Sequence, residues 1–219
     1  MVNNLLHNLD TPSHYLRVCF LDFSKAFDRI NHSILIQKLI SMGVRSCLIP
    51  WICDFLSSRR QAVKINMVQS EWNYINGGVP QGTKLGPMLF LVMINDLELK
   101  SYNTSHWKYV DDITISVSLP RHGQSTLQSD LDVIQQWTER NEMKLNAKKC
   151  KEMTISFLRQ SPDAAPLHIN GQLLNPVTSF KVLGVIFNHQ LKWSDNVDMM
   201  VKVPMKRKLS LSSLKENLK

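Results

Sequence analysis

Two adjacent carboxylates between two strand-like segments are the feature that most constrains the fold of this sequence. Asp111 and Asp112 follow a polar segment and precede residues 113–117, whose alternating apolar and polar side chains are typical of a strand. Two unit charges about 4 Å apart repel by roughly 4 kcal/mol at an effective dielectric constant near 20, so such a pair requires compensation. The pattern predicts a hairpin whose tip binds a metal ion.

A third carboxylate, Asp22, lies within residues 18–23, an apolar run that is typical of a buried strand. Carboxylate oxygens with few histidine or thiol ligands nearby suit magnesium. Two magnesium ions about 3.5–4 Å apart can activate a hydroxyl and stabilise a departing phosphate. These residues therefore point to nucleotidyl transfer. Taken alone, paired aspartates also cap helices and start turns, so the Tyr-Val-Asp-Asp string leaves that alternative open.

Further sequence blocks help to decide between a metal site and a simple turn for the paired aspartates. Residues 20–28 read Phe-Leu-Asp-Phe-Ser-Lys-Ala-Phe-Asp, residues 78–82 read Gly-Val-Pro-Gln-Gly, and residues 109–112 read Tyr-Val-Asp-Asp. The later blocks are Leu-Asn-Ala-Lys-Lys-Cys at 145–150 and Phe-Lys-Val-Leu-Gly-Val at 180–185. In this order the blocks resemble those of reverse transcriptases, most closely the enzymes of LINE-type non-LTR retrotransposons, and they cover most of the chain.

The resemblance implies an α+β fold, namely a polymerase palm with an antiparallel catalytic sheet and packed helices, joined by partial fingers and a truncated thumb. It divides the chain into a palm with partial fingers at residues 1–187 and a truncated, thumb-like basic tail at residues 188–219. The order of strand-like and helix-like segments also fits an α+β domain. Because Asp22 lies close to the amino terminus, little room is left for the finger segments that precede it in the family.

The same resemblance assigns catalytic and metal-binding roles to Asp22, Asp111 and Asp112. It implies two Mg²⁺ ions, for which Mn²⁺ can substitute, with Asp22 and Asp111 as principal ligands and Asp112 as an assisting ligand. In the alternative, Asp22 is a turn residue at a strand end and the aspartate pair is a polar hairpin tip.

Substrate-binding residues follow from the same blocks. Phe27 matches the family position where an aromatic ring excludes a ribonucleotide 2′-hydroxyl, although an aromatic residue in an apolar block is ordinarily core. Pro80, Gln81 and Gly82 match a motif near the incoming nucleotide and the template, where glycine permits a close approach of the backbone. A loop that ends before a helix is the alternative explanation for this motif.

Lys149 matches the basic position that protonates the departing pyrophosphate in the family. The adjacent Lys148 leaves open which of the two lysines has this role, and a solvated lysine pair is the alternative to both. Residues 180–184 resemble the segment that grips the primer, although their apolar alternation is equally compatible with a structural strand.

Composition fits a globular protein with one principal domain, because 43% of the 219 residues are hydrophobic and 20% are charged. The formal net charge of +8 would suit a nucleic-acid partner. Residues 202–219 hold six basic residues against Glu216, so most of that excess lies in the tail. The tail is expected to contact phosphates, to direct the protein to the nucleus, or to form only a solvated helix face.

Several classes of protein are disfavoured by the sequence. No apolar run approaches the length of about 20 residues that spans a bilayer, and no signal-like segment opens the chain. The four cysteines lack Cys-x-x-Cys spacing, so neither a zinc site nor a disulfide framework is expected, and the seven histidines are dispersed. The expected setting is intracellular, either nuclear or cytoplasmic, without membrane attachment or secretion.

Local patterns predict several elements. A helix over 34–42 is expected to be capped by Asn31 or Ser33 and ended by Gly43, and Ser125 and Gln128 have the spacing of a capping box. Further helices are expected at 51–56 and after 86–87. Two strand pairs are expected: residues 61–66 with 71–76, and residues 167–169 with 172–174 through a turn at 170–171. Further strands are expected at 153–157 and within 181–187.

The predicted reaction is the extension of a DNA primer 3′-hydroxyl with deoxynucleoside triphosphates on an RNA template. One alternative is an inactive, nucleic-acid-binding remnant of a mobile element. Another is an RNA-directed RNA polymerase, which the aromatic Phe27 and the Pro-Gln-Gly block disfavour. The sequence does not indicate an oligomeric state.

Overall fold

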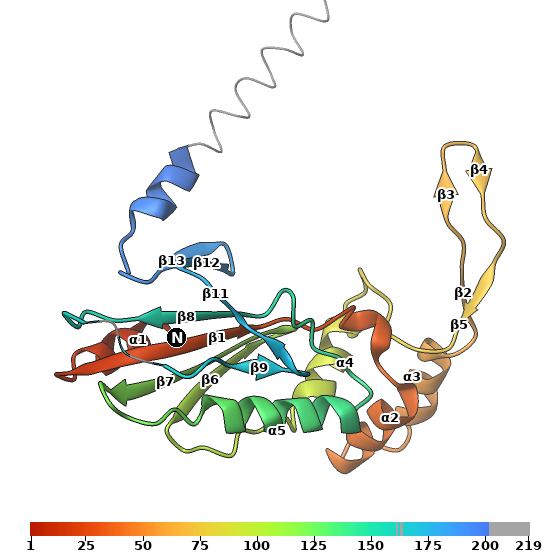
Figure 1. Cartoon of the computed structure of the whole chain (residues 1–219). Coiled ribbons are helices and arrows are strands. Elements are labelled where there is room, and N and C mark those ends of the chain that lie inside the picture. Colours follow the sequence, from red (N-terminus) through yellow and green to blue (C-terminus); the bar gives the residue numbers. More distant parts are fainter. Residues whose placement is uncertain (161, 163, 202–219) are drawn as a thin grey trace, which may run out of the picture.

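The computed structural model describes residues 1–160, 162 and 164–201, and it is built on a central five-stranded sheet (Figure 1). The strand order is β11-β8-β1-β7-β6. All neighbouring strands of this sheet are antiparallel except β8 and β11, which are parallel. The strands are β1 (His14–Leu21), β6 (Thr104–Tyr109), β7 (Asp112–Pro120), β8 (Lys151–Ile155) and β11 (Asn175–Pro176).

Strand β1 is buried on both faces, which explains why its sequence is mainly apolar rather than alternating, with the buried Arg17 as the charged exception. On one face, Cys19 and Leu21 join the main core, and on the other face Val18 and Phe20 join a second, smaller core. Successive side chains of a strand point to opposite faces, so a single strand supplies both cores. The α+β class predicted from the sequence agrees with the structure in its mixed content of helices and strands around a central sheet.

Helices cover the main-core face of the sheet. They are α2 (His32–Ser41), α3 (Ile49–Leu56), α4 (Leu85–Ile94) and α5 (Leu127–Arg140). The opposite face is covered by α1 (Val2–Leu9) and by the strand pair β12 (Ser179–Val182) and β13 (Val185–Asn188). In Figure 1, β12 and β13 lie above the sheet, on the side away from α5. A one-turn 3₁₀ helix, η1 (Phe27–Arg29), follows β1.

Helix ends agree with part of the local prediction. The Asn31 side chain accepts a hydrogen bond from the Ile34 amide at 3.1 Å, so Asn31 rather than Ser33 caps α2. At the end of α4, the Lys108 ammonium donates to the carbonyl oxygens of Ile94, Asn95 and Leu97 at 3.0–3.2 Å. This lysine satisfies carbonyl groups that have no partner within the helix.

The expected capping box at Ser125 and Gln128 is wrong. Thr126, not Ser125, directly precedes α5 and its side chain makes no capping hydrogen bond, although the Ser125 hydroxyl accepts a hydrogen bond from the Leu127 amide at 3.3 Å. The Gln128 amide group instead bonds the backbone of His168, accepting from its amide nitrogen at 2.9 Å and donating to its carbonyl oxygen at 3.2 Å. The side chain of Gln128, which the local spacing assigned to the cap, is therefore bound by the backbone of His168, a residue 40 positions later in the chain.

Residues 59–75 form a long hairpin that projects from the body (Figure 1). Near the body β2 (Arg59–Gln61) pairs with β5 (Asn73–Ile75), and near the tip β3 (Lys64–Ile65) pairs with β4 (Val68–Gln69). The predicted pairing of the two segments is confirmed, although each is divided into two short strands and the first begins at Arg59 rather than at residue 61. The predicted turn at Asn170–Gly171 is also confirmed, between β9 (His168–Ile169) and β10 (Gln172–Leu173).

The prediction of one strand within residues 181–187 is wrong. The chain reverses at Leu183 and Gly184, which have φ values of 47° and 89°, and β12 and β13 pair with each other. Glycine adopts this left-handed conformation without steric cost, which makes Gly184 a suitable reversal point. The strand predicted at 153–157 ends as β8 at Ile155, and Phe157 is exposed.

The carboxyl-terminal part of the chain is described only in part. Residues 194–201 are helical, and the basic tail at 202–219 lies outside the described residues. Among residues 1–160, 162 and 164–201, no helix is both long and apolar enough to cross a bilayer.

Candidate active site at the tip of the central hairpin

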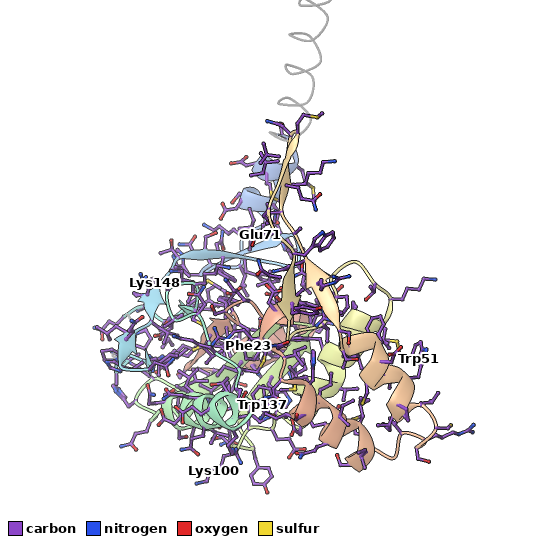
Figure 2. The ribbon with its side chains drawn as sticks, turned by 90° about the vertical axis from the view of Figure 1, so that its right-hand side faces the viewer. Phe23, Trp51, Glu71, Lys100, Trp137 and Lys148 are labelled. Carbon is purple, nitrogen blue, oxygen red and sulfur yellow. The ribbon has the colours of Figure 1, made fainter. Side chains whose placement is uncertain are left out.

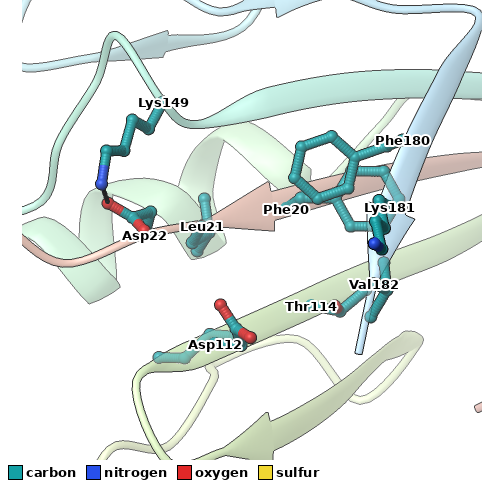
Figure 3. Close-up of a pocket in the computed structure, with 10 residues that line it drawn as sticks. Phe20, Leu21, Asp22, Asp112, Thr114, Lys149, Phe180, Lys181 and Val182 are labelled. Carbon is teal, nitrogen blue, oxygen red and sulfur yellow. Dashed lines mark ion pairs between the residues drawn. The ribbon is translucent and has the colours of Figure 1, made fainter. Parts of the chain in front are cut away.

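Two of the predicted carboxylates meet at one end of the central sheet. The register of β1 and β7 pairs Leu21 with Ile113, so the next pair outward is Asp22 and Asp112. Both side chains line a cavity of about 240 Å³ (Figure 3). The remaining lining residues come from β1, β7, Lys149 and the segment 180–182. The sheet therefore gathers motif residues that are more than 150 positions apart in the chain.

A tight turn positions the aspartate pair. Val110 and Asp111 connect β6 to β7, and Tyr109 pairs with Asp112 across the turn. Val110 has a φ of 54°, which is a strained conformation for a β-branched residue. Asp111 lies in the turn itself and is not among the residues that line the cavity. The structure thus brings Asp112, rather than Asp111, to the cavity with Asp22.

The electrostatics of the cavity favour an additional positive charge. The pKa of Asp112 is raised above its ordinary value, mainly by burial and further by the negative charges of Asp111 and Asp22. One carboxylate oxygen of Asp22, Oδ2, is buried without a hydrogen-bond partner. Lys149 Nζ lies 3.4 Å from this oxygen, but no hydrogen bond forms, and 67% of the lysine side chain is exposed. Water therefore screens much of this ion pair.

These groups have the donor chemistry of a site for a hard divalent cation. The carboxylates of Asp22 and Asp112 supply oxygen ligands, and the buried Asp22 oxygen needs a partner. Among the described residues, no three histidine, cysteine, aspartate or glutamate side chains converge closely enough to hold a metal. The suitability of this site for a divalent cation therefore depends on the carboxylates of Asp22 and Asp112, with Asp111 next to them in the turn.

The backbone of Asp22 is held by the segment that follows α5. Its carbonyl oxygen accepts a hydrogen bond from the Asn146 amide at 2.8 Å. Its amide donates to the Cys150 thiol sulfur at 3.4 Å, and the thiol lies 3.8 Å from the Asp22 carbonyl oxygen, to which it donates. Cys150 is fully buried, and this burial raises the pKa of its thiol. The thiol therefore remains protonated and able to donate.

Sequence reasoning missed Cys150. The scattered cysteines indicated only buried or incidental thiols, and Cys19 and Cys150 are indeed buried whereas Cys47 and Cys53 are exposed. The available signal was the position of Cys150 at the end of the Leu-Asn-Ala-Lys-Lys-Cys block. Only the packing of that block beside β1 shows which residue the thiol contacts.

Of the two candidate lysines, Lys149 is the one that lines the cavity. Lys148 is exposed, and its carbonyl oxygen accepts a hydrogen bond from the Lys151 ammonium at 2.9 Å. The cavity wall opposite the carboxylates includes Phe180, whose ring stacks on Phe20 with a centroid distance of 4.3 Å. The segment that resembles a primer grip therefore faces the candidate site.

Phe27 lies outside this cavity lining. Its half-buried ring stacks on Phe90 of α4 with a centroid distance of 4.9 Å and an interplanar angle of 23°. The core packing considered for this residue is therefore present in the structure. The predicted steric role toward the sugar stays a prediction.

Pro80 and Gln81 line a separate, open groove beside η1. Gln81 Nε2 donates to the Asp28 carboxylate at 3.1 Å, and Gly82 has a φ of 80°. Gly78 packs closely against η1, because a Cβ atom there would lie 2.8 Å from the backbone of Asp28. The glycines thus allow the loop to fit against η1, and the roles of Pro80, Gln81 and Gly82 toward substrates stay predictions.

Comparison with known proteins agrees with the sequence blocks. The family model for reverse transcriptase (RNA-dependent DNA polymerase) matches residues 2–187. The chain is 31% identical over 206 residues to the RNA-directed DNA polymerase from mobile element jockey of Drosophila funebris, covering 90% of this chain and 22% of that protein. It is 27% identical over 212 residues to the probable RNA-directed DNA polymerase from transposon BS of Drosophila melanogaster, with the same coverage.

Solved structures with a similar fold include the telomerase of Candida tropicalis in complex with a fragment of telomeric RNA. The TM-score is 0.58 at 14% identity, and the match covers 88% of this chain and 32% of the telomerase chain. At that identity the likeness concerns the fold alone. The chain spans about a fifth of the length of the curated mobile-element relatives that it matches. With a family model that covers most of its length, this chain belongs to the reverse transcriptase family, in the group of non-LTR retrotransposon enzymes.

Proposed function

We propose that this chain is the catalytic palm of an RNA-directed DNA polymerase, which extends a primer 3′-hydroxyl with deoxynucleoside triphosphates on an RNA template. The observation that carries the proposal is the pairing of Asp22 and Asp112 in one cavity, where a buried Asp22 oxygen has no hydrogen-bond partner. Two adjacent carboxylates repel each other, and the exposed ammonium group of Lys149 offsets their charge only in part, so a bound cation would stabilise the pair.

Asp22 and Asp112 would hold the cations, with Asp111 as the adjacent third carboxylate. Two bound Mg²⁺ ions, or Mn²⁺ in their place, would lower the cost of deprotonating the primer hydroxyl and offset the charge that develops on the leaving pyrophosphate. Because the Asp22 backbone is held by Asn146 and Cys150, its carboxylate starts from a fixed position. Such preorganisation avoids reorientation of the ligand during the reaction.

Other residues of the chain would bind and orient the substrates. Lys149 lies at the cavity mouth beside Asp22, where its ammonium group can donate a proton to the departing pyrophosphate. Phe27 would exclude a ribose 2′-hydroxyl, and Pro80, Gln81 and Gly82 would contact the incoming nucleotide and the template. The apolar wall at Phe20 and Phe180 would limit the access of water to the primer end.

In the same proposal, residues 1–187 form the palm with partial fingers, and residues 188–219 form a truncated, thumb-like basic segment. The partners are an RNA template, a DNA primer and deoxynucleoside triphosphates, and the setting is intracellular, either nuclear or cytoplasmic. A second candidate is an inactive palm that retains nucleic-acid binding. The observation that favours it is that, across the described residues, three metal-binding side chains do not converge.

The test is magnesium-dependent extension of a DNA primer on an RNA template by the purified full chain. Asp22→Asn and an Asp111→Ala, Asp112→Ala variant are expected to lose at least about 100-fold in rate, because each removes preorganised charge from the reacting centre. Asp54→Asn, an exposed aspartate on α3, is the matched control and should retain the wild-type rate. Binding of primer-template without extension in either Mg²⁺ or Mn²⁺ would favour the inactive palm.

A further inference from the structure

The projecting hairpin at residues 59–75 exposes large aromatic side chains that no part of the described chain covers. Trp72 is 60% exposed and Tyr74 is 71% exposed, and the apolar residues of the tip are exposed as well. Figure 2 labels Glu71 on this hairpin, well away from Lys100 on the body. Exposed apolar surface concentrated on one element marks a binding surface more often than scattered apolar residues do.

A cation accompanies the aromatic residues. Arg60 pairs directly with Tyr74 across β2 and β5, and its guanidinium carbon lies 5.8 Å from the centroid of the Tyr74 ring. Trp72 precedes Tyr74 by two residues, and Lys64 lies further along the hairpin. Aromatic faces with arginine and lysine beside them provide both parts of single-strand binding, namely stacking on unpaired bases and attraction of the phosphates.

The base of the hairpin continues into the groove that holds Pro80 and Gln81. The groove is strongly basic, because Asp28 is the one acidic residue among the described residues that line it, and it accepts the hydrogen bond from Gln81. The basic lining residues are Lys25, Arg29, Arg59 and Arg60. Lys25 follows Asp22 by three residues, so the groove lies close to the candidate active site in the chain. Its charge complements a phosphate backbone.

The two arginines at the base have different surroundings. The Arg59 guanidinium donates to the carbonyl oxygens of Leu56, Gly77 and Gly78 at 2.6–2.9 Å, which ties the hairpin to the body. For Arg60 the described contact is with the exposed Tyr74 ring, and its side chain is exposed. Arg59 therefore holds the hairpin in place, and Arg60 is available to a ligand.

We propose that this hairpin binds the single-stranded RNA template where it leaves the basic groove. Trp72 and Tyr74 stack on unpaired bases, and Arg60 and Lys64 contact the phosphates. The proposal rests on the proposed polymerase function, which supplies the template as the strand that runs through the groove. Duplex RNA cannot stack on this surface, because its bases are stacked on each other and do not present their faces to aromatic side chains.

The test measures the binding of a fluorescently labelled, unstructured RNA to the full chain by anisotropy. The variants are the double substitution Trp72→Ala, Tyr74→Ala and the single substitution Arg60→Gln. The matched control is Trp51→Ala, Tyr102→Ala, which removes a tryptophan of equal exposure (60%) and a fully exposed tyrosine from other elements. All proteins retain the basic tail, and thermal unfolding checks that each variant is folded.

The hairpin double variant is expected to lose about 10-fold or more in affinity for single-stranded RNA, the size of effect that loss of base stacking produces. Arg60→Gln is expected to weaken binding and to reduce its salt dependence. The control should bind within about twofold of the wild type, since its residues lie off the proposed path. Duplex RNA should bind the wild type and the hairpin variant equally.

Wild-type affinity in the folded hairpin variant would overturn the proposal, as would an equal loss in the control pair. An equal loss for duplex RNA would overturn the stacking role, and a larger loss for single-stranded DNA than for RNA would overturn the assignment to the template. The two proposals fail separately. Hairpin-dependent RNA binding without primer extension refutes the polymerase function alone, whereas extension with unchanged RNA binding refutes the hairpin role alone.

Discussion

At the residue scale, the candidate site depends on what surrounds Asp22 as much as on Asp22 itself. Its side chain faces the cavity, while its amide and carbonyl groups are bonded to Cys150 and Asn146. A ligand carboxylate that is held through its backbone has less freedom to lose when a cation binds. In the proposed mechanism, the contact between Cys150 and Asp22 would therefore affect the rate, even though the thiol does not line the cavity.

Replacing Cys150 tests this positioning role. Cys150→Ala removes both contacts to Asp22, so the rate of primer extension is expected to fall by about 10- to 100-fold, with a higher Mg²⁺ concentration required for half-maximal rate. Cys150→Ser retains a donor and an acceptor and should recover part of the rate.

The control is Cys19→Ala, a thiol in β1 that is equally buried in the same main core but, among the described contacts, makes no hydrogen bond to Asp22. It should lower the midpoint of thermal unfolding without changing the Mg²⁺ requirement. An unchanged Mg²⁺ requirement in folded Cys150→Ala would show that the thiol only fills space.

At the element scale, local patterns predicted turns and caps well when the partners were close in sequence. The Asn31 cap and the Asn170–Gly171 turn follow from local chemistry alone. The capping box at Ser125 failed because Gln128 bonds His168, and the strand within 181–187 failed because it reverses at Gly184. The first failure reflects a contact with a segment distant in sequence, whereas the second is a missed local turn, because Leu183 and Gly184 lie between the paired Val182 and Val185.

The loop that precedes α4 gives a prediction at this scale. Gly78 has a φ of 71°, and an added Cβ would lie 2.8 Å from Asp28 backbone atoms. Gly43 has a similar φ of 78°, but nothing lies within 4 Å of a Cβ there. Both alanine variants pay the cost of the left-handed conformation, about 1–2 kcal/mol, and only Gly78→Ala adds a clash.

Urea unfolding of the two variants separates these costs. Gly78→Ala is expected to reduce the free energy of unfolding by at least about 1 kcal/mol more than Gly43→Ala. Equal losses would mean that the loop and η1 move apart without cost, which would contradict the close packing described for the Gly-Val-Pro-Gln-Gly loop.

At the scale of the whole molecule, a buried ion pair joins the centre of the sheet to a distant loop. Arg17 of β1 donates through Nε to Glu152 of β8 at 2.6 Å and through Nη2 to the Ala165 carbonyl oxygen at 2.5 Å. Both charged residues are buried. A buried charge whose partner is removed is costly, because it is no longer compensated by charge or by water.

Glu152→Gln is therefore expected to reduce the free energy of unfolding by about 3–5 kcal/mol. The double variant Arg17→Met, Glu152→Leu should recover most of this loss, since replacing both charges with apolar side chains leaves no buried charge unpaired. Chemical denaturation of the wild type, the single variants and the double variant measures the coupling. A loss in the double variant as large as the sum of the single losses would refute the pairing.

The sequence by itself determined the family, the positions of the motif blocks and the elements whose signal is local. Strand periodicity, glycine turns and capping residues depend on residues that are close in sequence, so they can be predicted without knowledge of the fold. The hard-cation chemistry predicted for Asp22, Asp111 and Asp112 likewise rests on residue type and motif alone, and it stays a prediction.

Only the tertiary structure decided which of these residues meet. The register of β1 and β7 puts Asp112 beside Asp22 and leaves Asp111 in the turn, and a shift of one residue would reverse that choice. The packing of residues 145–150 beside β1 likewise turns Cys150 into a contact of Asp22. These outcomes depend on burial and pairing between segments about 90 to 130 residues apart, which no local pattern encodes.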